Sequence, residues 1–170
     1  RAVIKPEEVK VSKSMRNVLN QSRFTVTFDE DFRGVMQGCA NRPEEGTWIT
    51  EDFIEAYLTL HELGFAHSVE TWDGEGELVG GLYGVSLGSC FFGESMFARA
   101  SNASKVAFIT LARELQTWGF DCIDCQIMNP HLESLGADHL PREEFLTMLE
   151  GFLQKDTRRG RWSRSNPSAE

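Results

Sequence analysis

Two segments decide the fold of this chain: GESMFARASNASK at residues 93–105 and DCIDCQIMNPHLESLGADHLPREEF at residues 121–145. Each begins with residues whose pattern is typical of a strand, and each continues into a helix-start signal. Asn102 or Ser101 is suited to cap the first of these helices, and Pro141 favours the first turn of the second. The two segments therefore predict the order strand, helix, strand, helix in the second half of the chain.

The residues before this region predict strands and helices in alternation. Residues 24–28 alternate apolar and polar side chains, Thr50 is suited to cap a helix that Gly64 closes, and three strands follow around short turns. The predicted elements are a strand at 24–28, helices at 29–39 and 51–63, strands at 67–72, 78–85 and 90–95, a helix at 103–118, a strand at 122–127 and a helix at 142–153. This order predicts an α/β fold, a three-layer sandwich with a mixed, largely antiparallel central sheet. It is also the element order of the GNAT acyltransferase fold.

The length and composition are those of one domain. The chain has 170 residues and a hydrophobic content of 41%, which is enough for a core. No apolar run approaches the ~20 residues that span a bilayer, and no signal peptide is recognisable. Because the first residue is Arg1 and not Met, we expect a fragment or a processed product. We expect residues 1–154 to form the domain and residues 155–170 to form a basic polar tail.

The cysteine pattern predicts reduced thiols. Cys122 and Cys125 form a C-x-x-C, but on a strand they point to opposite faces, and no second C-x-x-C is present to complete a zinc site. The four histidines show no metal-ligand spacing either. Reduced thiols are typical of a cytosolic protein. We therefore expect a cytoplasmic protein that binds no metal and no cofactor.

The charge is distributed unevenly along the chain. The net charge is -9, but residues 1–23 carry +4 and residues 155–170 carry +3, while the part between them carries -16. Basic ends can contact phosphates, and an acidic centre attracts a cationic substrate. The alternative for the ends is that they are solvated tails.

Strand alternation divides residues 122–127 between two faces. One face carries Cys122, Asp124 and Gln126, and the other carries Ile123, Cys125 and Ile127. A carboxylate beside an amide on one face favours a cleft. The alternatives are hydrogen-bonded core groups or a solvent-facing edge.

The two opening segments closely resemble the family of leucyl/phenylalanyl-tRNA–protein transferases. Four further segments resemble that family in the same order, namely EEGTWIT at 44–50, EAYLTLHELG at 55–64, HSVETW at 67–72 and ELVGGLYGV at 77–85. The resemblance covers the chain up to Phe145. It implies a GNAT-like catalytic domain, and it also implies that the small N-terminal domain of the family is absent from this chain.

The resemblance further implies a reaction centre. The family's D-C-Q motif is matched at residues 124–126 and its G-E-S-M-F motif at residues 93–97, which would place Glu94 beside Asp124. Gln126 would position or relay a proton from the attacking amine, while Asp124 would orient Gln126 and hold a cationic acceptor. Two carboxylates at one site repel each other unless a cation lies between them, and the acceptor would supply it.

The resemblance also implies the substrate-binding residues. The positions that approximately match the family's apolar aminoacyl pocket are Leu82, Phe91, Met96 and Leu111. The alternative is that these four residues are simple core. Trp48 and Tyr57 occupy the family's aromatic positions and are suited to stack on the terminal adenine of tRNA or to close the pocket, although Tyr57 could equally be core. Asn129 would donate to the substrate.

We therefore hypothesise an aminoacyltransferase that moves Leu, Phe or Met from aminoacyl-tRNA to proteins with N-terminal Arg or Lys and so marks them for N-end-rule degradation. One alternative is an N-acyltransferase that uses acyl-CoA, but the junction SMFARASNASK at 95–105 lacks the glycines of a pyrophosphate loop. The other alternative is a non-catalytic tRNA-binding or adaptor domain, which the presence of Asp124, Gln126 and Glu94 argues against.

Overall fold

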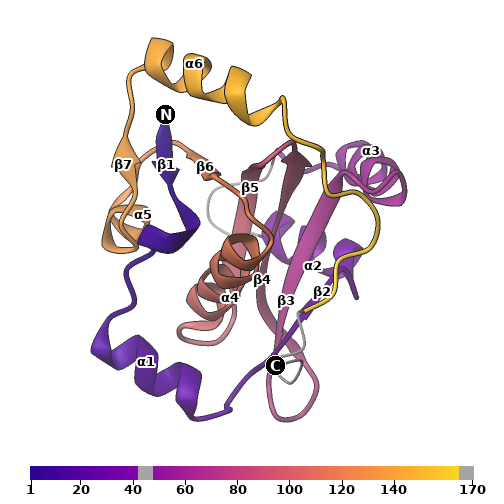
Figure 1. The fold of residues 1–170 in the computed structure, drawn as a ribbon. Helices are drawn as coiled ribbons and strands as arrows, with labels where there is room; N and C mark the ends of the chain where they lie inside the picture. The colour runs from indigo at the N-terminus through magenta and orange to yellow at the C-terminus, as the bar shows by residue number, and fades with distance from the viewer. Residues whose placement is uncertain (42–47, 165–170) are drawn as a thin grey trace.

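The computed structural model describes residues 1–41 and 48–164, and in these residues the chain forms a seven-stranded sheet in the order β2-β3-β4-β5-β6-β1-β7 (Figure 1). The strands are β1 (Ala2–Ile4), β2 (Thr25–Phe28), β3 (Ala66–Trp72), β4 (Leu78–Leu87), β5 (Cys90–Ala98), β6 (Cys122–Gln126) and β7 (Asp138–His139). The helices are η1 (Pro6–Glu8), α1 (Lys13–Asn20), α2 (Phe32–Ala40), α3 (Glu51–Glu62), α4 (Ala103–Thr117), α5 (Pro130–Ser134) and α6 (Arg142–Phe152). Every neighbouring pair of strands is antiparallel except β5 and β6, which are parallel. The predicted α/β class and the largely antiparallel sheet are confirmed.

Helices cover both faces of the sheet, because the strands bury both of their faces. On one face, α4 packs with Leu82 and Phe91 in a core that also includes Ile123. On the other face, α2 and α3 enclose Tyr83, which neighbours Leu82 on β4 and therefore points the opposite way. Further along this second face, Phe145 of α6 packs on β1, β5 and β6. The result is the three-layer arrangement that the element order predicted.

The helix ends follow the predicted caps in part. The Thr50 hydroxyl accepts from the amide of Phe53, as predicted for the start of α3. The helix predicted from residue 29 begins only at Phe32, because Asp31 is its cap. Asn102 precedes α4 in the left-handed conformation, with φ 69°, and its side chain makes no cap bond, so the predicted side-chain cap is not formed. Pro141 stands at the cap position of α6, immediately before its first turn.

Several short elements were not predicted from the sequence. They are β1, η1, α1, α5 and β7. Residues of β1 lie between β6 and β7 and are buried throughout, so they show no alternation. They extend the sheet beyond β6 and place the residue before β1, Arg1, next to the segment expected to be the reaction centre.

The predicted polar tail needs a correction in its described part, residues 155–164. The segment is basic, but it lies along the body of the protein as a strap and not as a free tail (Figure 1). The Trp162 side chain is 2% exposed, and Thr157 accepts a hydrogen bond from the Gly88 amide at 2.8 Å. Residues 165–170, and residues 44–47 of the EEGTWIT motif, lie outside the described residues.

Candidate functional site

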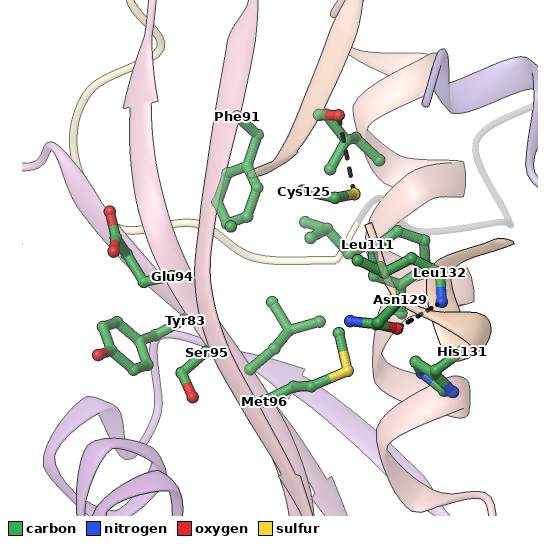
Figure 2. Close-up of a pocket in the computed structure, with 14 residues that line it drawn as sticks. Tyr83, Phe91, Glu94, Ser95, Met96, Leu111, Cys125, Asn129, His131 and Leu132 are labelled. Atoms are coloured by element: carbon green, nitrogen blue, oxygen red, sulfur yellow. Dashed lines mark hydrogen bonds between the residues drawn. The ribbon is translucent and has the colours of Figure 1, made fainter. Parts of the chain in front are cut away.

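The candidate site lies where β5 and β6 diverge. The two strands pair only from Cys90–Phe92 to Cys122–Asp124. On its other side β5 carries a bulge, because Tyr83 pairs with Ser95 and Gly84 pairs with Gly93, which leaves Glu94 as the extra residue. Bulges of this kind often redirect a side chain beside an active site. Here Glu94 lies on the side of β5 that faces Tyr83 (Figure 2).

Gln126 spans the gap between the diverging strands. Its Nε2 donates to the carbonyl oxygen of Gly93 at 2.8 Å and to Oε2 of Glu94 at 3.3 Å. Gln126 has φ 64°, a left-handed conformation that is uncommon for a residue other than glycine. The backbone amide of Gln126 donates to Oδ1 of Asp124 at 2.8 Å. The structure therefore brings Glu94, Asp124 and Gln126 together.

Asp124 lies on the face that strand alternation assigned to it, opposite Ile123 and Cys125. Its side chain is 0% exposed, and its Oδ2 accepts from Arg1 through Nη2 at 2.8 Å and Nε at 3.1 Å. The cation beside it is therefore Arg1. The prediction that the Asp124 face lines the cleft is wrong for the pocket described next, which lies on the Ile123 and Cys125 face. Gln126 reaches the site because its left-handed backbone departs from the alternation of β6.

An apolar pocket of about 240 Å³ lies beside the bulge (Figure 2). All four residues predicted for the apolar pocket line it, and so does Asn129. The Asn129 side chain also caps α5 by accepting from the Leu132 amide at 3.0 Å. The lining residues that were not predicted are Tyr83, Gly93, Ser95, Phe108, Ile123, Cys125, His131 and Leu132. Period-two alternation from Ile123 to Cys125 was a signal that could have identified two of them.

Two of these additional lining residues, Cys125 and His131, have shifted pKa values. Burial raises the pKa of the Cys125 thiol to about 12, so the thiol is protonated at neutral pH and is a poor nucleophile. Burial and, secondarily, the nearby Lys105 lower the pKa of His131. The imidazole is therefore neutral at pH 7, and its Nε2 has no hydrogen-bond partner among the described residues. The walls of the pocket are thus uncharged apart from Glu94.

The two predicted aromatic residues lie apart from the pocket lining. They belong to a row of rings in which Trp48 contacts Phe53 with 4.9 Å between centroids, and Phe53 stacks on Tyr57 at 4.6 Å. The Tyr57 hydroxyl lies beside the Glu94 carboxylate, while Trp48, 57% exposed, forms the solvent end of the row. Burial, followed by the charge of Glu94, raises the pKa of Tyr57 to about 12. The phenol therefore stays protonated across the physiological range, and its hydroxyl is able to donate to Glu94.

Replacing Tyr57 by phenylalanine should weaken the function of Glu94 without disturbing the ring row. The variant loses the hydroxyl beside Glu94. A hydrogen bond to a charged group contributes about 1.5–3 kcal/mol, and the half-buried position places the expected cost near the bottom of that range. If Glu94 holds a cationic substrate, the KM for that substrate should rise by about tenfold. Steady-state kinetics would measure this change. The control is Phe53→Leu, a variant that changes the row of rings but keeps the Tyr57 hydroxyl. An unchanged KM would show that the hydroxyl does not position Glu94.

Metal ligands do not cluster in the part of the chain that the structure describes. Within residues 1–41 and 48–164, no three His, Cys, Asp or Glu side chains come together in a way that could hold a metal ion. All four cysteines lie in this part, and none is in a disulfide. Among the described helices, none combines the length and the apolar character that crossing a membrane requires.

Comparison with known proteins identifies the family. A family model described as leucyl/phenylalanyl-tRNA protein transferase matches residues 3–150. Proteins named leucyl/phenylalanyl-tRNA–protein transferase from Myxococcus xanthus (strain DK1622) and Pseudomonas fluorescens (strain SBW25) are 52% and 55% identical to the chain over 166 and 157 residues. These matches cover 96% and 91% of this chain, and 70% and 69% of the relatives.

Among solved structures, L-PGS from Bacillus licheniformis matches with a TM-score of 0.49 and 14% identity over 88% of this chain and 50% of that chain. At this level of similarity the match supports no conclusion about function. The family model and the two close relatives, in contrast, match nearly the whole chain, and they agree with the motifs at residues 93–105 and 121–145. The chain belongs to the leucyl/phenylalanyl-tRNA protein transferase family.

Proposed function

We propose that this protein is an aminoacyltransferase, which moves Leu, Phe or Met from aminoacyl-tRNA to the α-amino group of proteins that begin with Arg or Lys. The observation that carries the proposal is the position of Gln126, whose Nε2 donates to Gly93 and Glu94 at the edge of the apolar pocket that both of these residues line. In a member of this family, such a bridge is suited to hold an amine against an ester.

The pocket supports the choice of donor. Leu82, Met96 and Leu111 give it an apolar interior, and its volume of about 240 Å³ can accommodate one large side chain. Pockets of this kind discriminate by shape, and a methylene contributes only about 1–3 kcal/mol. Overlapping acceptance of several large apolar residues is therefore expected.

The other side of β5 supports the choice of acceptor. Glu94 and Tyr83 lie on one side of the β5 ribbon, whereas Phe91 and Leu111 lie on the other (Figure 2). A cationic first residue of the acceptor can pair with Glu94 while the donor side chain occupies the apolar side. The α-amine then lies near the gap between β5 and β6, where Gln126 is held.

The chemistry requires little beyond positioning. The acceptor amine attacks the ester carbonyl, a C–N bond forms, the ester C–O bond breaks, and the proton lost by the amine ends on the 3′-terminal oxygen of the tRNA. Nε2 of Gln126 is committed to Gly93 and Glu94, which leaves Oε1 to accept from the attacking amine. The ester is already activated, so the rate comes mainly from holding amine and ester together.

The proposal extends to the unit that acts and to where it acts. We assign the catalytic domain to residues 1–154, with the strap at 155–164 packed on it. The new N-terminal Leu, Phe or Met would mark the acceptor for degradation. Four cysteines without a disulfide suit the reducing cytoplasm, where aminoacyl-tRNA is also found.

The direct test is to incubate the protein with labelled Phe-tRNA and a peptide that begins with Arg, and to look for Phe on the peptide. Transfer should require the free α-amine, so the N-acetylated peptide is the matched control for the acceptor. A peptide that begins with Asp is the control for charge. Acetyl-CoA in place of Phe-tRNA is the control for the donor, and acylation from it without transfer from Phe-tRNA would overturn the proposal.

The affinity for aminoacyl-tRNA should fall gently as salt rises. Lys10, Lys13, Arg16 and Arg23 are exposed at and around α1, whereas the rest of the protein is strongly acidic. Each phosphate contact contributes a slope of roughly 0.7–0.9 in a plot of log affinity against log salt. We expect the slope to correspond to about two to four such contacts. Filter-binding measurements between low and physiological salt would give this slope.

A double replacement of Lys13 and Arg16 by glutamine should lower that slope by about two, one for each lost contact. Lys155→Gln is the control, because Lys155 is paired with Asp121 at 2.7 Å. A slope that is flat, or that is the same in both variants, would remove α1 from the tRNA contact surface.

A further inference from the structure

Arg1 makes an ion pair with a fully buried carboxylate. Its guanidinium approaches Oδ2 of Asp124 through two nitrogens, at 2.8 and 3.1 Å, and Asp124 is 0% exposed. The Arg1 backbone is also fixed, because its carbonyl accepts from the amide of Leu140 at 2.8 Å. The guanidinium carbon lies 5.7 Å from the centre of the Phe145 ring, which closes the pair from one side.

Asp124, the acidic member of this ion pair, also contacts Gln126 directly. The second oxygen of Asp124, Oδ1, accepts from the backbone amide of Gln126 at 2.8 Å. That bond holds Gln126 in its left-handed conformation, from which Nε2 reaches the Gly93 carbonyl. A left-handed glutamine persists only where its surroundings fix it. The Asp124 carboxylate thus links Arg1 to the backbone of Gln126. One of its oxygens accepts from the guanidinium and the other accepts from the backbone amide.

We propose that Arg1 is a positioning residue for transfer: it fixes the Asp124 carboxylate, and Asp124 fixes the turn that directs Gln126 to the reacting amine. The inference rests on the proposed function, since it assigns a role within the same reaction. Asp124 in this arrangement neither takes the proton nor binds the acceptor. A carboxylate that is 0% exposed and already accepts from a guanidinium and a backbone amide is not accessible to substrate.

The first test is Arg1→Ala, measured as kcat and KM for the acceptor peptide and as Kd for Phe-tRNA. A misplaced Gln126 should lower kcat on the order of 10²-fold, because small displacements of positioning groups have effects of that size. The Kd for Phe-tRNA and the acceptor KM should change little, since the pocket and Glu94 are intact. A purely structural role would lower the folded fraction and leave kcat per folded molecule unchanged.

Rescue experiments keep the test decisive if Arg1→Ala folds poorly. Arg1→Lys supplies the charge without the two-nitrogen fork, so its kcat should lie between those of the wild type and Arg1→Ala. Free guanidinium ion should partly restore Arg1→Ala and should not stimulate the wild type. Arg33→Ala removes an exposed arginine paired with Glu51 and is the control, with unchanged kcat.

A double-mutant cycle tests whether Arg1 acts through Asp124. Asp124→Asn alone should lower kcat, and adding Arg1→Ala to it should lower kcat little further, because the target of the guanidinium is already gone. Losses that add would overturn the proposal, and so would wild-type kcat in well-folded Arg1→Ala. Failure of the proposed function looks different: the wild type itself would then not transfer Phe to the peptide.

Discussion

Replacing Gln126 by alanine is expected to remove most of the transfer activity. Transition-state stabilisation should fall by about 2–4 kcal/mol, as for loss of one preorganised polar group, so kcat should fall on the order of 30- to 10³-fold. The side chain supplies the bridge from Gly93 to Glu94 and the Oε1 that accepts from the amine. The backbone amide that bonds to Asp124 remains in the variant. The Kd for Phe-tRNA should stay within about twofold, because Gln126 is not part of the pocket lining.

The left-handed backbone of Gln126 calls for a matched variant. Alanine at φ 64° is strained, so part of its effect could come from the turn itself. Asparagine tolerates this conformation and keeps the amide, but its side chain is one methylene shorter and does not reach Gly93. Gln126→Asn should therefore lose about as much kcat as Gln126→Ala. Steady-state kinetics on Arg-, Lys- and Ala-starting peptides would measure both, and wild-type turnover in either variant would place the reaction centre elsewhere.

Much of the fold follows from local patterns in the sequence. The β3–β4–β5 meander, α3 and α4 are long enough for their periodicity to be clear, and Thr50 marks the start of α3. The elements that were missed are short and depend on long-range contacts. The three residues of β1 are all buried, so they show no alternation, and only pairing with β6 and β7 makes them a strand.

The candidate site was predictable in its membership but not in its geometry. Family motifs identified Glu94, Asp124 and Gln126, and the structure brings these residues together. Two backbone irregularities decide how they meet, namely the bulge at Glu94 and the left-handed Gln126. Neither follows from hydrophobic periodicity, because both residue types occur in regular strands. Hydrophobic periodicity also gives no indication that Asp124 pairs with Arg1, which lies 123 positions away in the sequence.

The strap at residues 155–164 shows the opposite kind of error. Its composition suggested a free tail, whereas the segment is held on the domain by the buried Trp162 and by backbone contacts, although most of its residues are exposed. Arg159 donates to the carbonyl of Leu63 at 2.8 Å. Gly64 lies so close that a Cβ there would be 2.4 Å from the Gly160 nitrogen. One apolar residue among many basic ones, Trp162, is enough to anchor the segment. A periodicity search cannot detect a single anchor, since it responds only to repeated positions.

Replacing Trp162 by alanine is expected to destabilise the protein by about 3–5 kcal/mol, the usual cost of removing a large aromatic side chain from a core. The indole is 2% exposed and stacks on His67, with ring centres 3.7 Å apart and planes 7° from parallel. It also meets Trp118 edge-on at 4.9 Å. The Trp162 amide donates to Oδ2 of the buried Asp29 at 2.7 Å, so release of the strap would also expose this carboxylate to water.

The loss of stability in Trp162→Ala should lower the melting temperature by roughly 6–20 °C, since a chain of this size loses about 2–4 °C per kcal/mol. Trp48→Ala is the matched control, because Trp48 is 57% exposed and the same truncation there should change stability by less than about 0.5 kcal/mol. Thermal and denaturant unfolding would measure both variants. Equal losses at the two positions would show that Trp162 does not anchor the strap, whereas a large loss at Trp162 alone would make residues 155–164 part of the folded domain.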